Sequence, residues 1–175
     1  MLSAFVLVDP TVFHFEDADR VRATIKTLGA LVELVVADVV ADAAIVTRPD
    51  PSLLGVETSA GCTIFEDADL GQALARALPE ARRDNALIIA PGYAPDFTFR
   101  AEVESAFGSA GPRPLALLRE PETLFQRLLP SLASVAGVLA TRSALSAIAQ
   151  SHGSHLSALK RALSATPMRT RAIRV

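Results

Sequence analysis

The stretch CTIFEDADLGQALARALPEARRDNALIIA, residues 62–90, decides the fold class of this chain. Two short apolar runs, 62–66 and 86–90, enclose a segment in which Leu70, Ala73 and Leu74 recur at three- and four-residue intervals. That spacing predicts a helix with one apolar face, and the flanking runs predict strands buried on both sides. Strand, helix and strand in this order form the basic unit of a parallel sheet covered by helices.

The same alternation extends in both directions along the chain. We expect further strands at 3–8, 43–47, 115–119 and 138–141, and helices at 19–41, 50–59, 97–107, 122–135, 143–150 and 155–163, followed by an extended segment at 170–175. The sequence therefore predicts a three-layer α/β/α sandwich with a mainly parallel sheet, formed by a single domain over residues 1–175.

Composition places the chain among folded globular proteins. Half of its 175 residues are hydrophobic and 21% are charged. Cys62 is the single cysteine and cannot form an internal disulfide, and the first residues lack the features of a secretory signal, so we expect a cytoplasmic protein. The most apolar stretch, 29–46, is interrupted by Glu33, Asp38 and Asp42, which argues against a transmembrane segment.

Charge is distributed unevenly along the chain. Residues 1–122 carry all 19 acidic side chains and 10 of the 17 basic ones, whereas residues 123–175 carry seven basic side chains and no carboxylate. Two interpretations stay open. The basic segment forms an anion-binding surface, or it packs beside the acidic part of the same chain.

The pentapeptide FEDAD occurs twice, at 15–19 and 65–69. Its Asp-x-Asp spacing is typical of divalent-cation sites in sugar-nucleotide enzymes. Each copy, however, lies between an apolar run and a helix, where an aspartate caps the free backbone N–H groups of the first helical turn. We expect Asp67 and Asp69 to cap a helix, and a place at the ligand crevice of the sheet stays open for them.

From residue 30 onward the order of segments resembles the glycosyltransferase family 2-like group, whose nucleotide-sugar transferase fold is called GT-A. The stretches that carry the resemblance are ALVELVVADVVADAAIVTRPD (30–50), SAGCTIFEDADLGQALARALPEARRDNALIIAPGYAPDFTF (59–99), RAEVESAF (100–107) and LATRSALSAIA (139–149). They cover nearly the whole chain by segment order and apolar spacing. The resemblance implies a GT-A-like fold and a nucleotide sugar, or another anionic small molecule, as ligand.

The chain departs from the family pattern at three places where the chemistry resides. Thr47 stands where the family carries a base-binding aspartate, and Ala90 and Gly92 stand at the two metal-binding aspartates of its Asp-x-Asp motif. The family's catalytic carboxylate late in the chain also has no counterpart, since no acidic residue follows Glu122. Alanine and glycine side chains cannot ligate a hard cation, so we expect no metal and no cofactor, and hence no metal-dependent transfer.

The resulting hypothesis is a glycosyltransferase-like protein, catalytically degenerate, with a residual nucleotide-sugar pocket. The candidate residues are Thr47, Arg48, Asp50, Asp67, Asp69, Ala90, Gly92 and Tyr93. One alternative is a non-catalytic binding or regulatory module. The other is a metal-independent transferase with His152 or His155 as base and a cation set against the diphosphate drawn from Arg48, Arg142, Lys160 and Arg161.

Nucleic-acid binding is not expected, because the chain has no tryptophan, one tyrosine and only a mildly basic tail. An oligomer stays open, since the sequence alone does not identify an interface.

Overall fold

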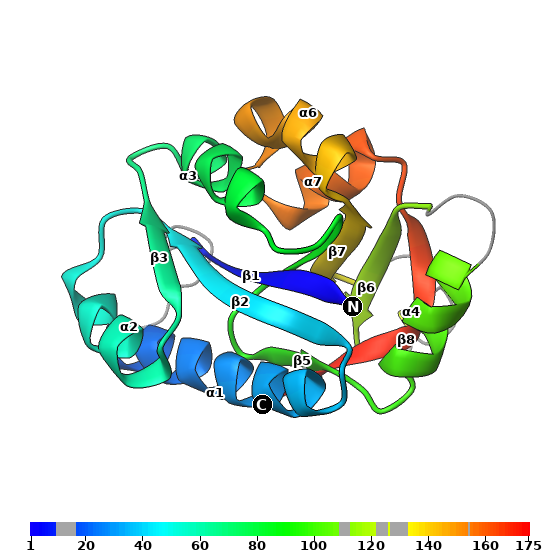
Figure 1. Cartoon of the computed structure of the whole chain (residues 1–175), viewed down its shortest axis with the longest axis horizontal. Coiled ribbons are helices and arrows are strands. Elements are labelled where there is room, and N and C mark those ends of the chain that lie inside the picture. Colours follow the sequence, from blue (N-terminus) through cyan, green and yellow to red (C-terminus); the bar gives the residue numbers. More distant parts are fainter. Residues whose placement is uncertain (10–16, 109–112, 122–125, 127–132, 154) are drawn as a thin grey trace.

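The computed structural model describes residues 1–9, 17–108, 113–121, 126, 133–153 and 155–175. Its strands form one sheet in the order β3-β2-β1-β4-β7-β6-β8-β5, with helices on both faces (Figure 1). The strands are β1 (Leu2–Val8), β2 (Val40–Thr47), β3 (Thr63–Glu66), β4 (Asn85–Ile89), β5 (Tyr93–Pro95), β6 (Leu115–Arg119), β7 (Val135–Thr141) and β8 (Thr166–Arg174). The helices are α1 (Asp17–Val36), α2 (Leu54–Ala60), α3 (Leu70–Ala77), α4 (Phe99–Gly108), α6 (Arg142–His152) and α7 (Leu156–Ala162), with 3-10 turns η1 (Pro51–Leu53) and η2 (Leu78–Glu80).

The sheet is mixed, with a parallel half. Strands β3, β2, β1 and β4 pair in parallel, as does β6 with β8. Strand β7 runs antiparallel to both of its neighbours, and β5 runs antiparallel to β8. The sandwich expected from the sequence is confirmed, and the antiparallel pairs are the part that the apolar pattern did not indicate.

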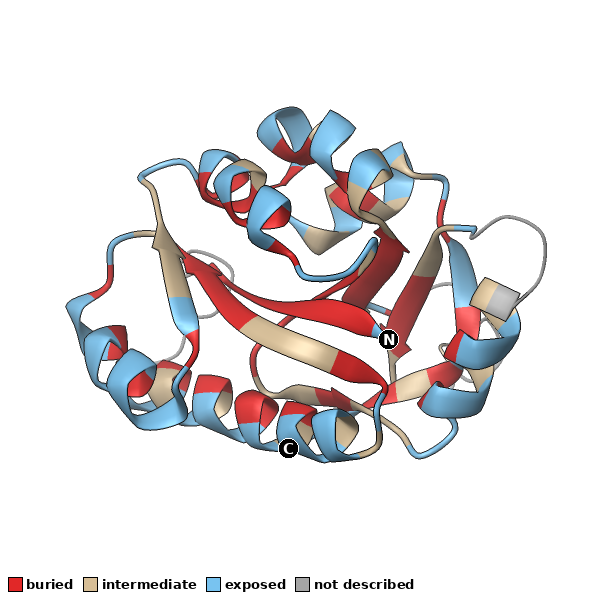
Figure 2. Cartoon of the chain, in the orientation of Figure 1, coloured by how far each residue is buried: buried red, intermediate tan, exposed pale blue. Residues whose placement is uncertain are grey.

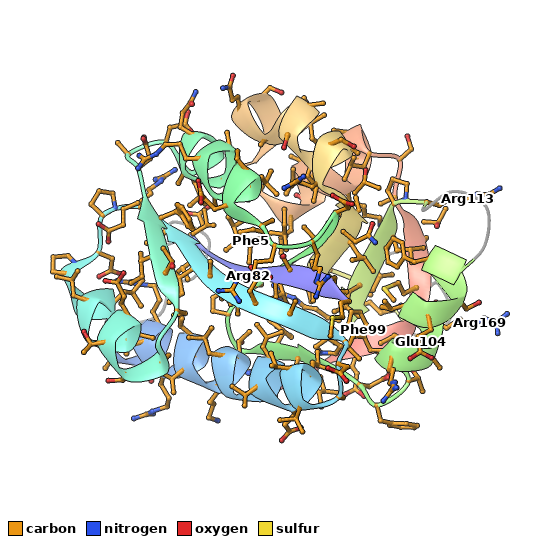
Figure 3. The ribbon with its side chains drawn as sticks, in the orientation of Figure 1. Phe5, Arg82, Phe99, Glu104, Arg113 and Arg169 are labelled. Carbon is orange, nitrogen blue, oxygen red and sulfur yellow. The ribbon has the colours of Figure 1, made fainter. Side chains whose placement is uncertain are left out.

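Both faces of the sheet are buried by helices, as Figure 2 shows. Along β1, Val6 and Val8 face the side covered by α1, α2 and α4, whereas Phe5 and Leu7 face α3, α6 and α7. Figure 3 labels one large ring on each side, Phe5 beneath α3 and Phe99 at the start of α4, and both are almost fully buried. This two-sided burial explains why the strands show apolar runs instead of alternation.

Helix α1 ends earlier than the apolar spacing predicts. The sequence indicates a helix to residue 41, but α1 ends at Val36 and β2 begins at Val40. Asp38 between them has φ 58°, a left-handed conformation that stops the helix, and the buried Val39 then leads into the sheet. In the described part of the chain, no helix combines the length and apolarity needed to span a membrane.

The helix predicted at 122–135 is wrong at its carboxyl end, because Val135 opens β7. Most of that segment, and the start of the first FEDAD copy, lie outside the described residues.

Glu102 on α4 ties this helix to β8. One carboxylate oxygen accepts hydrogen bonds from the Thr170 hydroxyl at 2.6 Å and the Thr170 N–H at 2.8 Å, and the other accepts from the Arg169 N–H at 2.8 Å. Burial opposes ionisation of this carboxyl, but the hydrogen bonds from Thr170 and Arg169 outweigh it and lower the pKa of Glu102. The ionised form is therefore the one that stabilises the folded protein.

We expect Glu102→Gln to lower the free energy of unfolding at pH 7 by about 1–3 kcal/mol. Because the folded-state pKa is depressed, this contribution is present above the unfolded value of about 4.3 and is lost as pH falls through the folded value. Urea unfolding at pH 7 and at pH 3 measures the difference. Glu104→Gln, on the exposed side of the same helix, is the control and is expected to change little. An equal Glu102→Gln effect at both pH values would contradict the assignment.

Candidate functional site

The carboxyl ends of the parallel strands meet at one edge of the sheet. The β2–β3 register pairs Thr47 with Glu66, and the β1–β4 register pairs Val6 with Ile89. At the same edge β7 begins and β6 ends, since the Arg119 N–H bonds to the Ser134 carbonyl at 2.9 Å. In open α/β sheets ligands bind outside this edge.

At the end of β3, Asp69 of the second FEDAD copy caps α3, as predicted, whereas Asp67 forms a turn ahead of the helix and does not cap it. Asp69 Oδ1 accepts the Gly71 N–H at 2.8 Å, and Asp67 Oδ1 accepts the Asp69 N–H at 3.0 Å. Asp67 also lies 3.4 Å from Arg76 in an exposed ion pair. These carboxylates are engaged by the local backbone, and this engagement explains why the motif stands at a helix start.

At the end of β2, the Thr47 side chain is buried and donates to the Arg48 carbonyl at 2.9 Å. Asp50, three residues on, forms a buried ion pair with Arg20 of α1, with an Oδ2 to Nη2 distance of 2.7 Å. Its other oxygen accepts the Ser52 hydroxyl at 2.6 Å and the Ser52 N–H at 3.1 Å. Burial opposes its ionisation, yet the bonds from Ser52 and Arg20 lower the pKa of Asp50. Asp50 therefore anchors the turn to α1.

A cavity of about 410 Å³, here called the crevice, opens where β1, β4, β6 and β7 meet. It contains a carboxylate and an imidazole from distant parts of the chain. Asp9, directly after β1, is almost fully buried, and its Oδ2 lies 3.3 Å from Nδ1 of His155, whose side chain is half exposed. The lining residues are Leu7, Asp9, Ala90, Arg119, Ala133, Ser134, Val135, His155, Leu156 and Ser157.

A second cavity of about 450 Å³, here called the basic cavity, lies on the other side of Arg119. The Arg119 guanidinium is 4.5 Å from the centre of the Tyr93 ring, and Arg119 lines both cavities. Arg119 Nε is buried, and among the described residues it has no hydrogen-bond partner. The lining residues are Asp19, Arg22, Ala23, Lys26, Pro91, Gly92, Tyr93, Arg119, Arg174 and Val175.

The backbone conformation and a backbone hydrogen bond of Gly92 fix the turn after β4. The φ of Gly92 is 80°, a conformation that glycine adopts without strain, and its N–H donates to the Thr27 hydroxyl at 2.8 Å. This bond holds the turn after β4 against α1 and presents Tyr93 to the basic cavity.

The structure brings together only part of the predicted candidate set. Ala90 lines the crevice, and Gly92 and Tyr93 line the basic cavity. Of the described residues, the other five candidates line neither cavity: Thr47, Arg48, Asp50, Asp67 and Asp69. They lie along the same edge at the ends of β2 and β3.

Sequence reasoning missed Asp9 and Arg119. Asp9 directly follows β1 and Arg119 ends β6, so the rule that ligands bind at the carboxyl ends of strands would have found both.

The cations suggested for a metal-free mechanism do not lie together at the carboxyl edge of the sheet. Arg142 donates to the Ala81 carbonyl at 3.2 Å and lies 3.4 Å from Asp84, at the amino end of β4 and thus at the opposite edge. Its proposed role against a diphosphate in the crevice is therefore wrong. Lys160 and Arg161 lie in the last turn of α7, which begins at the crevice and leads to the start of β8 at that opposite edge.

Metal ligation is not indicated at Ala90 and Gly92, whose side chains bear no donor atom. Within the described ranges, no three His, Cys, Asp or Glu side chains gather as a metal-binding group.

No family model matches this chain, and no curated protein matches it. Several solved structures match the chain. Glucosyl-3-phosphoglycerate synthase from Mycobacterium tuberculosis, in complex with phosphoglyceric acid, matches over 99% of this chain and 72% of its own, with a TM-score of 0.63 and 14% identity. The same synthase with Mn²⁺ and UDP-glucose gives a TM-score of 0.58 at 13% identity, over 99% of this chain and 71% of that one.

A mycobacterial protein matches over 82% of this chain and 54% of its own, with a TM-score of 0.54 and 16% identity. Identities this low show the fold alone. The fold is that of GT-A-like glycosyltransferases, in agreement with the expectation from the sequence.

Proposed function

We propose that this protein binds a sugar nucleotide, or a related anionic small molecule, at the carboxyl edge of its sheet, with cations of the chain in place of a divalent metal. The observation that carries the proposal is Arg119, which stands between the crevice and the basic cavity with a buried Nε that no described residue bonds. A phosphate oxygen is a suitable acceptor for such a donor, because guanidinium matches phosphate geometry.

The charges around the basic cavity support an anionic ligand. Arg22, Lys26, Arg119 and Arg174 line it, against the side-chain carboxylate of Asp19. Cationic side chains in this lining therefore exceed anionic ones by three. A diphosphate placed there is neutralised by side chains, which is the role a metal ion takes in metal-dependent transfer.

The candidate residues divide by role in this proposal. Ala90, Gly92 and Tyr93 line the cavities proposed for the ligand. Thr47 at the end of β2 and Arg48 after it lie farther along the same edge, and Asp50, Asp67 and Asp69 hold the neighbouring loops. UDP-glucose is the first probe, because the structurally similar synthase was solved with it.

An amide-shift titration with UDP and UDP-glucose in EDTA tests the proposal. We expect shifts at Asp9, Ala90, Gly92 and Ser134. Replacement of Arg119 by methionine is expected to raise Kd about 10- to 100-fold, because a charge-assisted hydrogen bond is lost. Arg161→Met, on the exposed side of α7, is the matched control. A separate apolar cavity lies between α1 and α2. Shifts confined to that cavity would contradict the proposal, as would an unchanged Kd in the Arg119 variant.

The pair Asp9 and His155 favours a second candidate function, metal-independent transfer. His155 Nδ1 faces the buried Asp9 carboxylate, so a proton on Nδ1 leaves Nε2 as the acceptor nitrogen. In this reaction Nε2 takes the proton of an acceptor hydroxyl while that oxygen bonds to the anomeric carbon. The bond from this carbon to the diphosphate breaks, and the nucleoside diphosphate leaves with the electron pair.

The structure favours His155 over His152 for this role. His152 is exposed in the last turn of α6, and its Nδ1 lies 2.7 Å from the neighbouring Ser151 hydroxyl. His155 lines the crevice and contacts a buried carboxylate, which orients the imidazole.

A further inference from the structure

The outer face of α1 carries a stripe of exposed residues that faces away from the sheet and is apolar except for Arg22 at its amino end. Arg22, Ile25, Gly29, Val32 and Val36 recur at alternating three- and four-residue steps, the spacing of core positions in a coiled coil. All five are exposed, and Figure 2 shows this side of α1 as largely exposed while its other side is buried. The exposed fractions reach 51% for Ile25, 59% for Val32 and 83% for Val36.

An apolar groove of about 610 Å³ lies between α1 and α2, and Ile25, Gly29 and Val32 of the stripe are part of its lining. Val21, Leu28 and Val35 line it from α1, and Gly55 and Val56 line it from α2. Leu54, at the start of α2, is 55% exposed. The stripe and groove together form a continuous apolar surface, of the kind that marks an interaction site.

Gly29 in the middle of the stripe has no role that the single chain explains. A Cβ built there meets nothing within 4 Å, and its φ is not in the left-handed region. Glycine inside a helix costs about 1 kcal/mol relative to alanine. A glycine at this position is explained if the backbone or a side chain of another molecule approaches α1 closely there.

We propose that a second copy of this chain covers the surface, with the two α1 helices antiparallel across a two-fold axis. In an antiparallel coiled coil, core positions of one type face those of the other type. Gly29 then lies opposite Val32 of the partner subunit, and Ile25 lies opposite Val36 of the partner subunit. This inference goes beyond the proposed function, and the two share Arg22 and Lys26, which also line the basic cavity.

Charge complementarity sets the orientation. Lys26 and Glu33 are exposed and occupy equivalent positions, each one residue from a core position. In the antiparallel arrangement Lys26 faces Glu33 of the partner subunit, and symmetry repeats the pair. In a parallel arrangement these residues would face the positions of Val21 and Leu28, which bear no charge. The observed charges therefore favour the antiparallel dimer.

Sedimentation velocity over a concentration series tests the dimer. We expect the wild type to be dimeric, and Lys26→Glu and Glu33→Lys alone each to raise the dimer Kd about tenfold, because two like-charge contacts replace two attractive ones. The double variant K26E/E33K restores both pairs and is expected to recover the wild-type Kd. A purely structural effect of the single changes would not be rescued in this way.

Two further variants complete the test. Val32→Glu is expected to give a monomer with an unchanged far-UV circular dichroism spectrum, and Arg161→Glu on α7 in the other helix layer is expected to leave the dimer intact. A wild type that is monomeric at about 100 μM, a concentration at which even a weak dimer would form, would overturn the proposal. Single variants that dimerise like the wild type, or a double variant no tighter than the singles, would also overturn it.

Discussion

Asp50→Ala is expected to lower the free energy of unfolding by about 3–5 kcal/mol. The substitution removes the carboxylate of Asp50 from the buried Arg20 guanidinium, since both side chains of the pair are only 9% exposed. It also removes the oxygen that accepts the Ser52 N–H at the start of η1. Urea unfolding of the purified variant, followed by circular dichroism, measures the change.

Two comparison variants separate the sources of this effect. Asp50→Asn retains a side-chain oxygen for Ser52 but removes the charge, so a smaller loss is expected. Asp84→Ala removes the partner of Arg142 in an ion pair whose carboxylate side chain is 92% exposed, and it is expected to cost less than about 1 kcal/mol. Equal losses for Asp50→Ala and Asp84→Ala would show that Asp50 does not anchor the turn.

His155→Gln is expected to lower the rate of sugar transfer by roughly 10²- to 10⁴-fold, because glutamine cannot take a proton from the acceptor. Its Kd for UDP-glucose is expected to stay within about twofold of the wild type, since in the proposed reaction the imidazole acts on the acceptor and not on the diphosphate. Transfer rates in EDTA and calorimetric affinities measure the two quantities separately.

Two further variants, Asp9→Asn and His152→Gln, test whether the effect is specific to His155 and its carboxylate neighbour. Asp9→Asn keeps the shape of the side chain beside His155 and removes its charge, so a smaller fall in rate is expected. His152→Gln is the matched control and is expected to retain the wild-type rate. If the wild type binds UDP-glucose without any turnover, transfer is contradicted and binding stands as the function.

Most of the fold follows from the sequence because buried strands and amphipathic helices leave periodic apolar patterns. The strand at 115–119 is predicted with the bounds that β6 has, and the strand at 86–90 is one residue from β4. The antiparallel placement of β7 leaves no such pattern, because apolar alternation says nothing about strand direction. Strand β5 is three residues long and depends on pairing with β8, which the local sequence cannot show. A single domain and a cytoplasmic location stay predictions.

The site is less predictable than the fold, because its residues come from segments far apart in the chain. In the turn after β4, Ala90 lines the crevice, and Gly92 and Tyr93 line the basic cavity, while their role in a site stays a prediction. Asp9 and His155 are 146 residues apart, and only the folded chain brings them within 3.3 Å. Asp50 stands in a turn that the resemblance marks for base binding, but its carboxylate is held by Arg20, a contact that spacing alone does not reveal.

Calorimetric titration of the wild-type protein with UDP-glucose, in EDTA and again in about 1 mM MnCl₂, tests the central claim most directly. Since chain cations are proposed to neutralise the diphosphate where Ala90 and Gly92 offer no metal ligand, binding is expected in both buffers with Kd values that agree within about threefold. Binding that appears only with Mn²⁺, or strengthens tenfold or more with it, would contradict the account.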